Sequence, residues 1–343
     1  MTELNSAGSI DKDQPDGTKT VGCGEDSRMG RERPGGETGS RGSGLGSRRN
    51  MQGKIIRGVG GFYYVYAEGR GIFECRARGI FRKDGTKPLV GDNVRISETI
   101  DTDKQIGHID DILPRKNSLI RPAAANIDQA LVIFACACPE PNLNLLDRFL
   151  ITMADRNIPV LICFNKTDLA PAGRMEELKK IYENCGCPVM TASFLRMEGL
   201  DPIRKALDGK TTVVAGPSGV GKSSLTNLLA PDAGMEIGTL SRRIERGKQT
   251  TRHTQLVRIW EDTYFLDTPG FSSLYLTGIE YRDLPSFYPE FETYASGCRF
   301  PGCMHISEPD CAVKNALRED KISRVRYENY LLLADELKNQ RRY

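Results

Sequence analysis

Between residues 53 and 117, short runs of alternating apolar and polar residues are separated by turns that contain glycine, at Gly60-Gly61, Glu68-Gly69 and Asp84-Gly85. These runs are typical of short strands, which we expect at residues 54–57, 62–66, 71–75, 93–96 and 106–109. Five short strands predict a small β-barrel. The OB-fold is the usual five-stranded case, and an SH3-like barrel would give much the same pattern.

From residue 127 to residue 230 the pattern changes to longer apolar runs that alternate with amphipathic stretches. The continuous apolar runs predict strands buried on both faces, at residues 129–135, 159–164, 188–190 and 211–215. Apolar residues at helical spacing predict helices near residues 145–150 and at 174–185, 200–207 and 223–229. With further strands at 255–260 and 263–266, this is a doubly wound α/β domain, which binds its ligands at the carboxyl ends of its strands.

Composition narrows the class of protein. Of the 343 residues, 39% are hydrophobic and 27% are charged, as in a soluble globular protein. No apolar run approaches the ~20 residues of a membrane helix. The N-terminus has no apolar signal core, so we expect a cytoplasmic protein without a membrane partner. Its ten cysteines then indicate reduced thiols or metal ligands.

Two features are compatible with contact to nucleic acid. Residues 241–254 carry five Lys/Arg against one Glu, which indicates either a solvated basic loop or a contact with phosphate. The aromatic rings of the strand at 62–66 either fill the barrel core or stack on bases at its surface. The net charge of +3 is too small to decide between these interpretations.

A phosphate-binding loop follows the strand predicted at 211–215. Its sequence is Gly216-Pro217-Ser218-Gly219-Val220-Gly221-Lys222-Ser223, and a predicted helix follows it, as the motif requires. The glycines let backbone N–H groups point at phosphate oxygens, and the helix N-terminus adds favourable partial charge. We expect Lys222 to reach the β- and γ-phosphates and the Ser223 hydroxyl to bind Mg²⁺.

Asn165-Lys166-Thr167-Asp168, at the end of an apolar strand, predicts a guanine-reading loop. The Asp168 carboxylate can accept hydrogen bonds from N1–H and the 2-amino group of guanine, and adenine lacks that donor pair. Such pairing rejects the wrong base because a mismatch leaves buried polar groups unpaired. Thr191-Ala192-Ser193, after the strand at 188–190, fits the short loop that offers backbone N–H groups to the guanine carbonyl.

Asp267-Thr268-Pro269-Gly270 is typical of a loop that senses Mg²⁺ and the γ-phosphate. We expect Asp267 to hold Mg²⁺, directly or through water, and the Gly270 N–H to sense the γ-phosphate. The order of the three motifs is unusual, because an ordinary GTP-binding domain has the phosphate loop first and the guanine loop last. Here the guanine loop leads, which indicates a circularly permuted domain.

The sequence departs from the usual GTPase pattern at the residue that activates the attacking water. In Ras-like GTPases a glutamine follows the Asp-x-x-Gly motif, but Phe271 stands there in this chain and offers no donor or acceptor. Gln249 is the nearest candidate for orienting the water. Thr250 or Thr251, directly after it, is the candidate switch threonine, and we assign Thr251 as a further Mg²⁺ ligand.

A metal site is predicted near the C-terminus. Cys298, Cys303, His305 and Cys311 form a C-x₄-C-x-H-x₅-C pattern. Three thiolates and one imidazole suit tetrahedral Zn²⁺, and four protein ligands imply a closed, structural site. Such a site can stabilise a small lobe by ~10 kcal/mol or more.

With these motifs the chain resembles a known family, the circularly permuted, ribosome small-subunit-dependent GTPase A. The resemblance covers about residues 51–343 and includes Ser224 directly after the phosphate loop. It implies an N-terminal OB-fold, binding to the small (30S) ribosomal subunit near its decoding region, a role in late maturation of that subunit, and GTP hydrolysis that the subunit stimulates. Many family members carry a catalytic histidine before the paired threonines, where this chain has Gln249.

We therefore expect a multidomain GTP hydrolase with a disordered extension at 1–50, an OB-fold RNA-binding domain at 51–117, a circularly permuted GTPase domain at 118–280 and a mainly helical zinc-binding domain at 281–343. It would act as a monomer with one structural Zn²⁺ and with Mg²⁺ bound alongside GTP, and hydrolysis would time its release from the 30S subunit and its rRNA. One rival is a non-enzymatic RNA-binding module regulated by GTP or GDP. Another is a GTPase that acts on a different RNA assembly or a protein partner.

The permutation also suggests a hypothesis about coupling. It moves the chain ends, so the barrel and the zinc lobe both attach beside the segment that changes with nucleotide state. We therefore expect both RNA-facing domains to contact residues 241–280.

Overall fold

The structure, a computed structural model, describes residues 50–79, 81, 85–99, 105–119, 122–231, 254–267 and 276–340. All of these residues belong to one unit of the chain, Ser47–Tyr343. The predicted disorder of residues 1–50 lies outside the described residues except at Asn50. Four of the predicted functional residues also lie outside them, namely Gln249, Thr250, Thr251 and Gly270.

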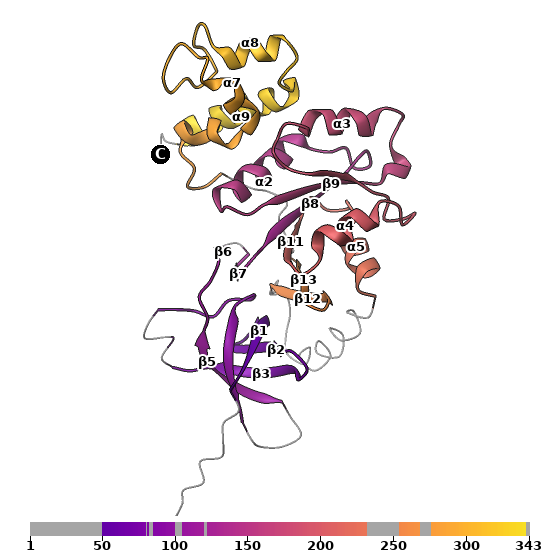
Figure 1. The fold of residues 1–343 in the computed structure, drawn as a ribbon, viewed down its shortest axis with the longest axis vertical. Helices are drawn as coiled ribbons and strands as arrows, with labels where there is room; N and C mark the ends of the chain where they lie inside the picture. The colour runs from indigo at the N-terminus through magenta and orange to yellow at the C-terminus, as the bar shows by residue number, and fades with distance from the viewer. Residues whose placement is uncertain are drawn as a thin grey trace, which may run out of the picture. The chain divides into compact units, whose positions relative to one another are not determined.

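The N-terminal barrel (Figure 1) is built from β1 (Asn50–Val59), β2 (Phe62–Ala67), β3 (Gly71–Ala77), β4 (Asn93–Glu98) and β5 (Ile106–Ile112). Its strand order is β1-β2-β3-β5-β4, and β1 pairs again with β4 to close it. The described neighbours are antiparallel except β3 and β5, which run parallel with Glu74 opposite Ile106. This closed five-stranded order is that of an OB-type barrel and confirms the prediction.

Strand β2 distributes its aromatic residues over two faces, because successive side chains of a strand alternate. Val65 and Ala67 are buried in the barrel core, and Tyr63, on the same face, packs against that core. The other aromatic residues lie on the outer face. There Phe62 is covered by the guanidinium of Arg76, 4.5 Å from its ring centroid.

The sheet of the α/β part contains β8 (Gln129–Ala135), β9 (Val160–Asn165), β10 (Val189–Thr191), β11 (Thr211–Ala215), β12 (Gln255–Trp260) and β13 (Thr263–Asp267). Its order is β10-β9-β8-β11-β13-β12, and the strands are parallel except that β12 runs antiparallel to β13. A small hairpin of β6 (Ser118–Leu119) and β7 (Ala124–Ala125) precedes it. The sequence does not predict this hairpin, because strands of two residues leave no periodic pattern.

Helices cover both faces of this sheet, and their bounds are α2 (Leu143–Asp155), α3 (Arg174–Tyr182), α4 (Leu200–Leu207) and α5 (Lys222–Leu229). Along β8, Ala130, Val132 and Phe134 pack in one apolar core with residues of α2 and α3. The residues between them, such as Leu131 and Ile133, pack in a second core with residues of α4 and α5 (Figure 1). A strand covered on both sides buries the side chains of both faces, which is why β8 is apolar at every position after Gln129.

Helix α2 begins where the sequence supplies a cap. The Asn142 side chain accepts a hydrogen bond from the Leu145 N–H at 3.0 Å, which satisfies one of the free donors of the first turn. The apolar face behind that cap is buried through Leu146, Phe149 and Leu150. The helix therefore extends further at both ends than the predicted segment around 145–150.

The strand order shows the permutation directly. Strand β11 leads to the phosphate loop and lies between β8 and β13, although it follows β8, β9 and β10 in the chain. Helix α4 makes the connection from the edge strand β10 back to the central strand β11. Residues 193–211, which contain α4 and join β10 to β11, thus form an ordinary crossover connection in this fold.

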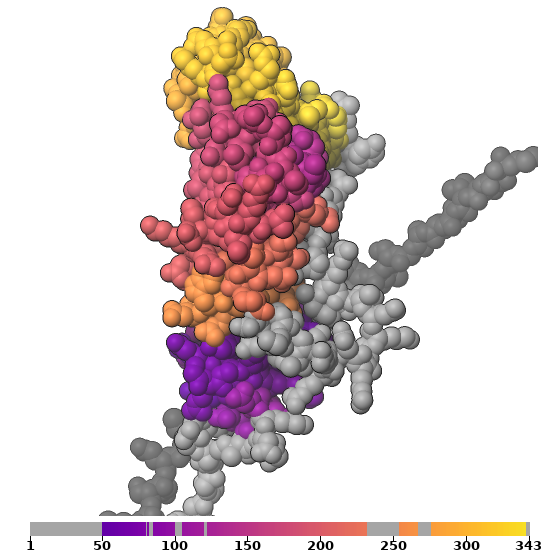
Figure 2. Space-filling view, turned by 90° about the vertical axis from the view of Figure 1, so that its right-hand side faces the viewer, coloured from indigo at the N-terminus to yellow at the C-terminus, as the bar shows by residue number. Residues whose placement is uncertain are grey.

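The barrel adjoins the α/β sheet at β12. Strand β1 pairs antiparallel with β12, with Arg57 opposite Gln255. In the space-filling view the indigo residues of the barrel touch the orange residues around β12 (Figure 2). The guanidinium of Arg258 in β12 lies 4.6 Å from the ring centroid of Tyr66 in β2. The barrel therefore contacts the strand that follows the basic loop.

The C-terminal part contains the 3₁₀ helix η2 (Tyr281–Phe287) and the helices α7 (Pro289–Ala295), α8 (Ala312–Arg318) and α9 (Arg324–Gln340). Phe291 and Tyr330 meet edge to face in its core, with ring centroids 5.0 Å apart. Leu276, six residues after Gly270 in the sequence, is also buried in this core. Within the described residues, no helix is long and apolar enough to span a membrane. The domain boundaries stay a prediction.

Candidate functional site

The phosphate-binding loop joins β11 to α5 in a backbone conformation that depends on two glycines. Gly216 has φ +134°, and a Cβ there would lie 2.1 Å from the Ile133 carbonyl oxygen. Gly221 has φ +105°, and a Cβ there would lie 2.4 Å from Nδ2 of Asn165. Any other residue would both strain the backbone and clash with these atoms of β8 and β9.

Lys222 is the first residue of α5, and its ammonium group contacts the phosphate-binding loop. Its ammonium donates to the carbonyl oxygens of Gly216 at 2.8 Å and Pro217 at 2.6 Å. Ser223 and Ser224 follow in the first turn of the same helix. A cation and the N-terminal N–H groups of a helix thus converge where the sequence predicts phosphate binding.

Asn165 ties the guanine loop to its two neighbours. Its buried side-chain amide donates to the Val220 carbonyl of the phosphate loop at 2.8 Å. Its side-chain oxygen accepts from the Phe194 N–H at 3.0 Å. This residue therefore fixes three loops relative to one another, a role that the sequence motif does not reveal.

Asp168 is held by a neighbouring hydroxyl. Ser193 Oγ donates to Asp168 Oδ1 at 2.5 Å and itself accepts from the Arg196 N–H at 3.2 Å. The hydrogen bond from Ser193 is the main reason that the pKa of Asp168 lies below the ordinary aspartate value. The carboxylate therefore stays charged, as reading of the guanine edge requires.

The remaining residues of the guanine loop hold the backbone in place. The Thr167 N–H donates to the Ala192 carbonyl at 3.2 Å. Lys166 has a left-handed conformation with φ +64°, and its ammonium donates to the Cys138 carbonyl in the loop after β8. Both contacts join neighbouring strand ends at the carboxyl edge of the sheet.

The segment Thr191-Ala192-Ser193 uses some of its backbone N–H groups within the protein. Thr191 is the last residue of β10, the Ala192 N–H donates to the Phe164 carbonyl at 3.0 Å, and the Ser193 N–H donates to the Glu198 carbonyl at 3.1 Å. These two N–H groups are already used within the protein. Ser193 contributes its hydroxyl to Asp168 instead, and its predicted contact with guanine stays a prediction.

One cleft of about 820 Å³ brings the two loops together. Of the predicted residues, it is lined by Asn165, Lys166, Asp168, Ser218, Gly219, Gly221, Lys222, Ser223 and Ser224. Of the other predicted residues, Gly216, Pro217, Val220 and Thr167 belong to the same loops without lining it. Five further lining residues were missed: Leu169, Phe194, Leu195, Asn227 and Leu228. The usable sequence signal was the apolar Leu169 directly after Asp168 and the apolar Phe194 and Leu195 directly after Ser193.

The predicted switch loop begins at the same sheet edge. Asp267 ends β13, which runs parallel to β11, and Asp267 pairs in register with Val214. Its backbone therefore lies beside the start of the phosphate loop, where a Mg²⁺ ligand is expected. The described residues end at Asp267 on this side and resume at Leu276, so Gly270 is not placed.

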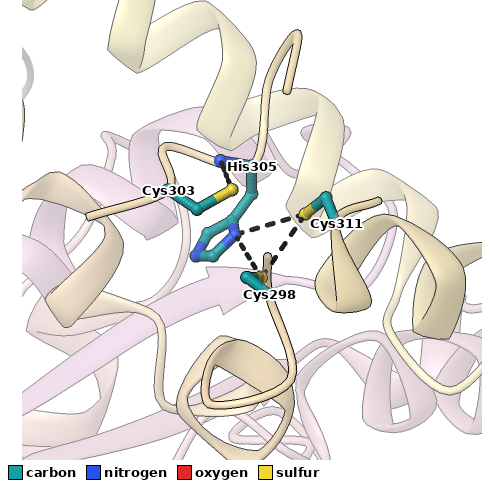
Figure 3. Close-up of side chains that lie close together, drawn as sticks. All are labelled: Cys298, Cys303, His305 and Cys311. Atoms are coloured by element: carbon teal, nitrogen blue, oxygen red, sulfur yellow. Dashed lines mark hydrogen bonds between the residues drawn. The ribbon is translucent and has the colours of Figure 1, made fainter. Parts of the chain in front are cut away.

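The predicted metal ligands converge in the C-terminal part. The ligand atoms of Cys298, Cys303, His305 and Cys311 all lie within 4.8 Å of one another. Figure 3 shows the His305 ring directed between Cys298 and Cys311, with its Nδ1 3.6 Å and 3.4 Å from their sulfurs. The sulfurs of Cys298 and Cys311 are 3.8 Å apart, and a tetrahedral ion with bonds of about 2.3 Å to sulfur requires about that separation. The donor set therefore fits such an ion.

Neighbouring groups fix the loop that carries these ligands. The Tyr327 hydroxyl of α9 donates to the His305 carbonyl at 2.7 Å. The Glu308 carboxylate accepts from the N–H groups of Met304 and Ile306, each at 2.9 Å. These hydrogen bonds orient the ligand loop as second-layer partners do around metal sites.

Comparison with known proteins agrees with this organisation. The model of the RsgA GTPase family matches residues 112–277, and that of the RsgA N-terminal domain matches residues 52–109. The small ribosomal subunit biogenesis GTPase RsgA of Agathobacter rectalis is 56% identical over 303 residues, which cover 85% of this chain and 100% of that protein. The protein of the same name from Alkaliphilus metalliredigens is 47% identical over 292 residues, which cover 85% and 99%.

Two solved structures have a similar fold. The crystal structure of YloQ, a circularly permuted GTPase, superposes with a TM-score of 0.70 at 36% identity and covers 85% of this chain and 96% of that one. The crystal structure of YjeQ from Thermotoga maritima gives a TM-score of 0.70 at 32% identity and covers 84% and 99%. The cleft, the permuted strand order and these relatives lead to one conclusion: the chain belongs to the RsgA family of GTP-hydrolysing enzymes.

Proposed function

We propose that this GTPase binds GTP with Mg²⁺ in the cleft between the phosphate and guanine loops, and that it acts in late maturation of the small (30S) ribosomal subunit. The observation that carries the proposal is a cleft lined by residues of both loops, with Lys222 and Asp168 among them. The names of the relatives, which refer to small ribosomal subunit biogenesis, support the biological setting.

The roles of the residues follow from their chemistry. Asp168 reads the guanine edge, and the loop N–H groups with Lys222 hold the phosphates. Ser223 and Asp267 hold Mg²⁺, which neutralises charge on the phosphates when bound. Thr251 completes the Mg²⁺ ligands, Gly270 senses the γ-phosphate, and Gln249 orients the attacking water. These last three assignments rest on sequence alone.

The barrel and the C-terminal part would bind rRNA, with the protein acting as a cytoplasmic monomer. Two contacts support a coupling between that binding and the nucleotide: β1 pairs with β12 at Gln255, and Leu276 is buried in the C-terminal core. Gln255 follows the segment that contains Gln249, Thr250 and Thr251, and Leu276 follows the segment that contains Asp267 and Gly270. Subunit binding would thereby stimulate hydrolysis, and hydrolysis would release the protein.

We assign the cluster of Cys298, Cys303, His305 and Cys311 to one structural Zn²⁺. Four protein donors leave no open coordination position for chemistry, and three sulfurs favour Zn²⁺ over the oxygen-preferring cations. The ion would hold the loop between α7 and α8 in the shape that contacts RNA. It takes no part in hydrolysis.

The test is GTP turnover measured with and without isolated small ribosomal subunits. We expect turnover to rise in their presence, and the Lys222→Ala variant, which loses a phosphate ligand, to show neither basal nor stimulated turnover. In parallel, the protein should co-sediment with small subunits in the presence of a non-hydrolysable GTP analogue and dissociate with GDP. Equal turnover in both conditions, or equal co-sedimentation with both nucleotides, would refute the release mechanism.

A further inference from the structure

The segment that carries Asp168 is tied, at its first end, to the loop that joins β8 to α2, residues 136–142. The Cys136 N–H donates to the Asn165 carbonyl at 2.8 Å. The Lys166 ammonium donates to a second carbonyl of the same loop. Both contacts come before Asp168 in the chain, so they fix one side of the turn that presents its carboxylate.

Arg174 supplies the anchor on the other side. It is the first residue of α3 and lies six residues after Asp168. Its Nε donates to the Cys136 carbonyl at 3.4 Å, and its Nη2 donates to the Glu140 carboxylate. The Arg174 side chain is 19% exposed, so these contacts lie largely out of water. One cation therefore holds the start of α3 at two points of the β8–α2 loop.

Arg174 also has a second carboxylate partner, and the two partners have different consequences. Its Nη1 donates at 2.8 Å to Glu177, one turn further along α3. A pair within one helix cannot fix the position of that helix relative to another element. The pair with Glu140 joins two different connections of the sheet. Of these two ion pairs, the one with Glu140 can therefore control where the segment with Asp168 lies.

Guanine recognition depends on that position. Asp168 lies in the short 3₁₀ helix η1 (Thr167–Leu169), between the two anchors. Its carboxylate has to meet two donors on the edge of the base, and hydrogen bonds weaken steeply when their geometry departs from linear. The Ser193 hydroxyl holds Oδ1, but the backbone that carries the carboxylate is set by the ends of the segment. A segment fixed in advance also has less freedom to lose when the ligand binds.

We propose that Arg174 is a positioning residue for guanine recognition, which fixes the segment after Asp168 on the β8–α2 loop and so sets the direction from which the carboxylate meets the base. This assignment rests on the proposed function of the cleft as the GTP site. Arg174 is not among the residues that line the cleft, so it acts through Asp168 and not by touching the nucleotide.

The test is calorimetric titration of the full chain with GDP and with inosine diphosphate, which lacks the 2-amino group and offers Asp168 one donor fewer. In Arg174→Met, GDP affinity should fall roughly three- to tenfold. The affinity for inosine diphosphate should fall by a smaller factor, because it has one hydrogen bond to lose where GDP has two. The preference for GDP should therefore narrow. A merely structural defect would reduce the fraction of competent protein and leave that preference unchanged.

Two matched variants each remove one carboxylate from the same guanidinium. Glu140→Gln should weaken GDP binding roughly twofold, as expected for a partly exposed ion pair, and narrow the preference in the same direction. Glu177→Gln should leave both affinities unchanged. Arg174→Lys keeps a cation opposite Glu140 and should restore part of the preference. Equal GDP binding by the two glutamine variants, or an unchanged preference in Arg174→Met, would overturn the positioning role.

A double variant tests whether Arg174 acts through Asp168. In an Asp168→Asn background the carboxylate that reads the base is absent, so adding Arg174→Met should not change the ratio of the two affinities further. A further change would contradict the role. In steady-state turnover, Arg174→Met alone should raise KM for GTP and leave kcat unchanged, since it weakens binding in the ground state and the transition state alike.

The failure of this role is distinguishable from failure of the function on which it rests. If the unmodified chain binds no GDP, or if Lys222→Ala binds it equally well, the cleft is not the nucleotide site and the proposed function fails. If the unmodified chain binds GDP and Arg174→Met keeps the full preference for it, the positioning role alone fails.

Discussion

At the scale of single residues, Asn165 shows how one side chain can organise a site. The motif assigns it to nucleotide binding, but in the structure its amide joins the phosphate loop and the loop after β10. Removing such a buried amide leaves a donor and an acceptor unpaired, which costs about 1–3 kcal/mol per group. Nucleotide affinity therefore depends on residues that shape the cleft as well as on those that line it.

The base preference belongs to Asp168. In the Asp168→Asn variant the side-chain amide can donate to the 2-oxo group of xanthine, whereas the carboxylate can only accept from guanine. We expect preference to shift from GTP toward xanthosine triphosphate, measured by direct competition between the two nucleotides. Unchanged preference would refute the assignment of the guanine loop.

Ser193 should determine the pH below which Asp168 no longer recognises guanine. Its hydrogen bond lowers the pKa of Asp168, so the charged carboxylate survives below the ordinary aspartate range. In Ser193→Ala that pKa rises, and protonation on acidification then removes the guanine acceptor at a higher pH. Titration of GDP affinity from neutral to acidic pH should show the earlier loss in the variant. At neutral pH, where both carboxylates are charged, the difference should be smallest; parallel curves would contradict the role.

At the scale of elements, a buried ion cluster joins the C-terminal helices to the α/β part. Arg326 of α9 is 1% exposed and donates to Asp147 of α2 at 2.5 Å and to Glu290 of α7 at 2.7 Å. Its guanidinium also lies 4.5 Å from the ring centroid of Tyr288. In the sequence, Arg326 lies in a helix that mixes charged and apolar residues, and nothing in that pattern indicates that its side chain is buried.

Removal of this cation should destabilise the junction. Arg326→Met leaves two carboxylates buried without their partner, and breaking a buried ion pair in this way costs about 3–5 kcal/mol. We expect a lower midpoint in urea-induced unfolding. Arg299→Met, which breaks an exposed pair with Asp310 in the same part of the chain, should change the midpoint little. Equal effects of the two variants would show that the cluster contributes no more than a surface pair.

At the scale of the whole molecule, the barrel and the C-terminal part each contact a residue that follows a segment with candidate switch residues. The hypothesis drawn from the permutation required contacts with residues 241–280, and they are found at Gln255 for the barrel and at Leu276 for the C-terminal part. A change in the conformation of these segments would therefore act on the barrel through Gln255 and on the C-terminal part through Leu276.

Removal of the metal should affect the C-terminal part before the nucleotide site. The ligand loop connects α7 to α8, and its hydrogen bonds to Tyr327 and Tyr330 depend on its shape. We expect chelation, or Cys298→Ser, to reduce the near-ultraviolet circular dichroism of these tyrosines and weaken binding to small subunits, while GDP binding persists. Cys138→Ser, at an exposed cysteine outside the cluster, is the control. An unchanged tyrosine signal in the Cys298→Ser protein would contradict a structural metal site.

The sequence by itself determined the barrel, the α/β alternation, the permuted motif order and the metal-ligand pattern. These are readable because they depend on local periodicity and on fixed spacings between chemically required residues. The precise bounds of α2 and the short β6–β7 hairpin were not readable, since helix ends and a two-residue pairing leave little periodic signal.

Only the tertiary structure decided which groups remain available at the site. It showed that the N–H groups of Ala192 and Ser193 are used within the protein, that Ser193 acts through its hydroxyl, and that Leu195 borders the cleft. It also placed Arg326 in the interior. These facts depend on contacts between residues distant in sequence, and a buried hydrogen bond or ion pair is set by the partner that packing brings near, which no local pattern encodes.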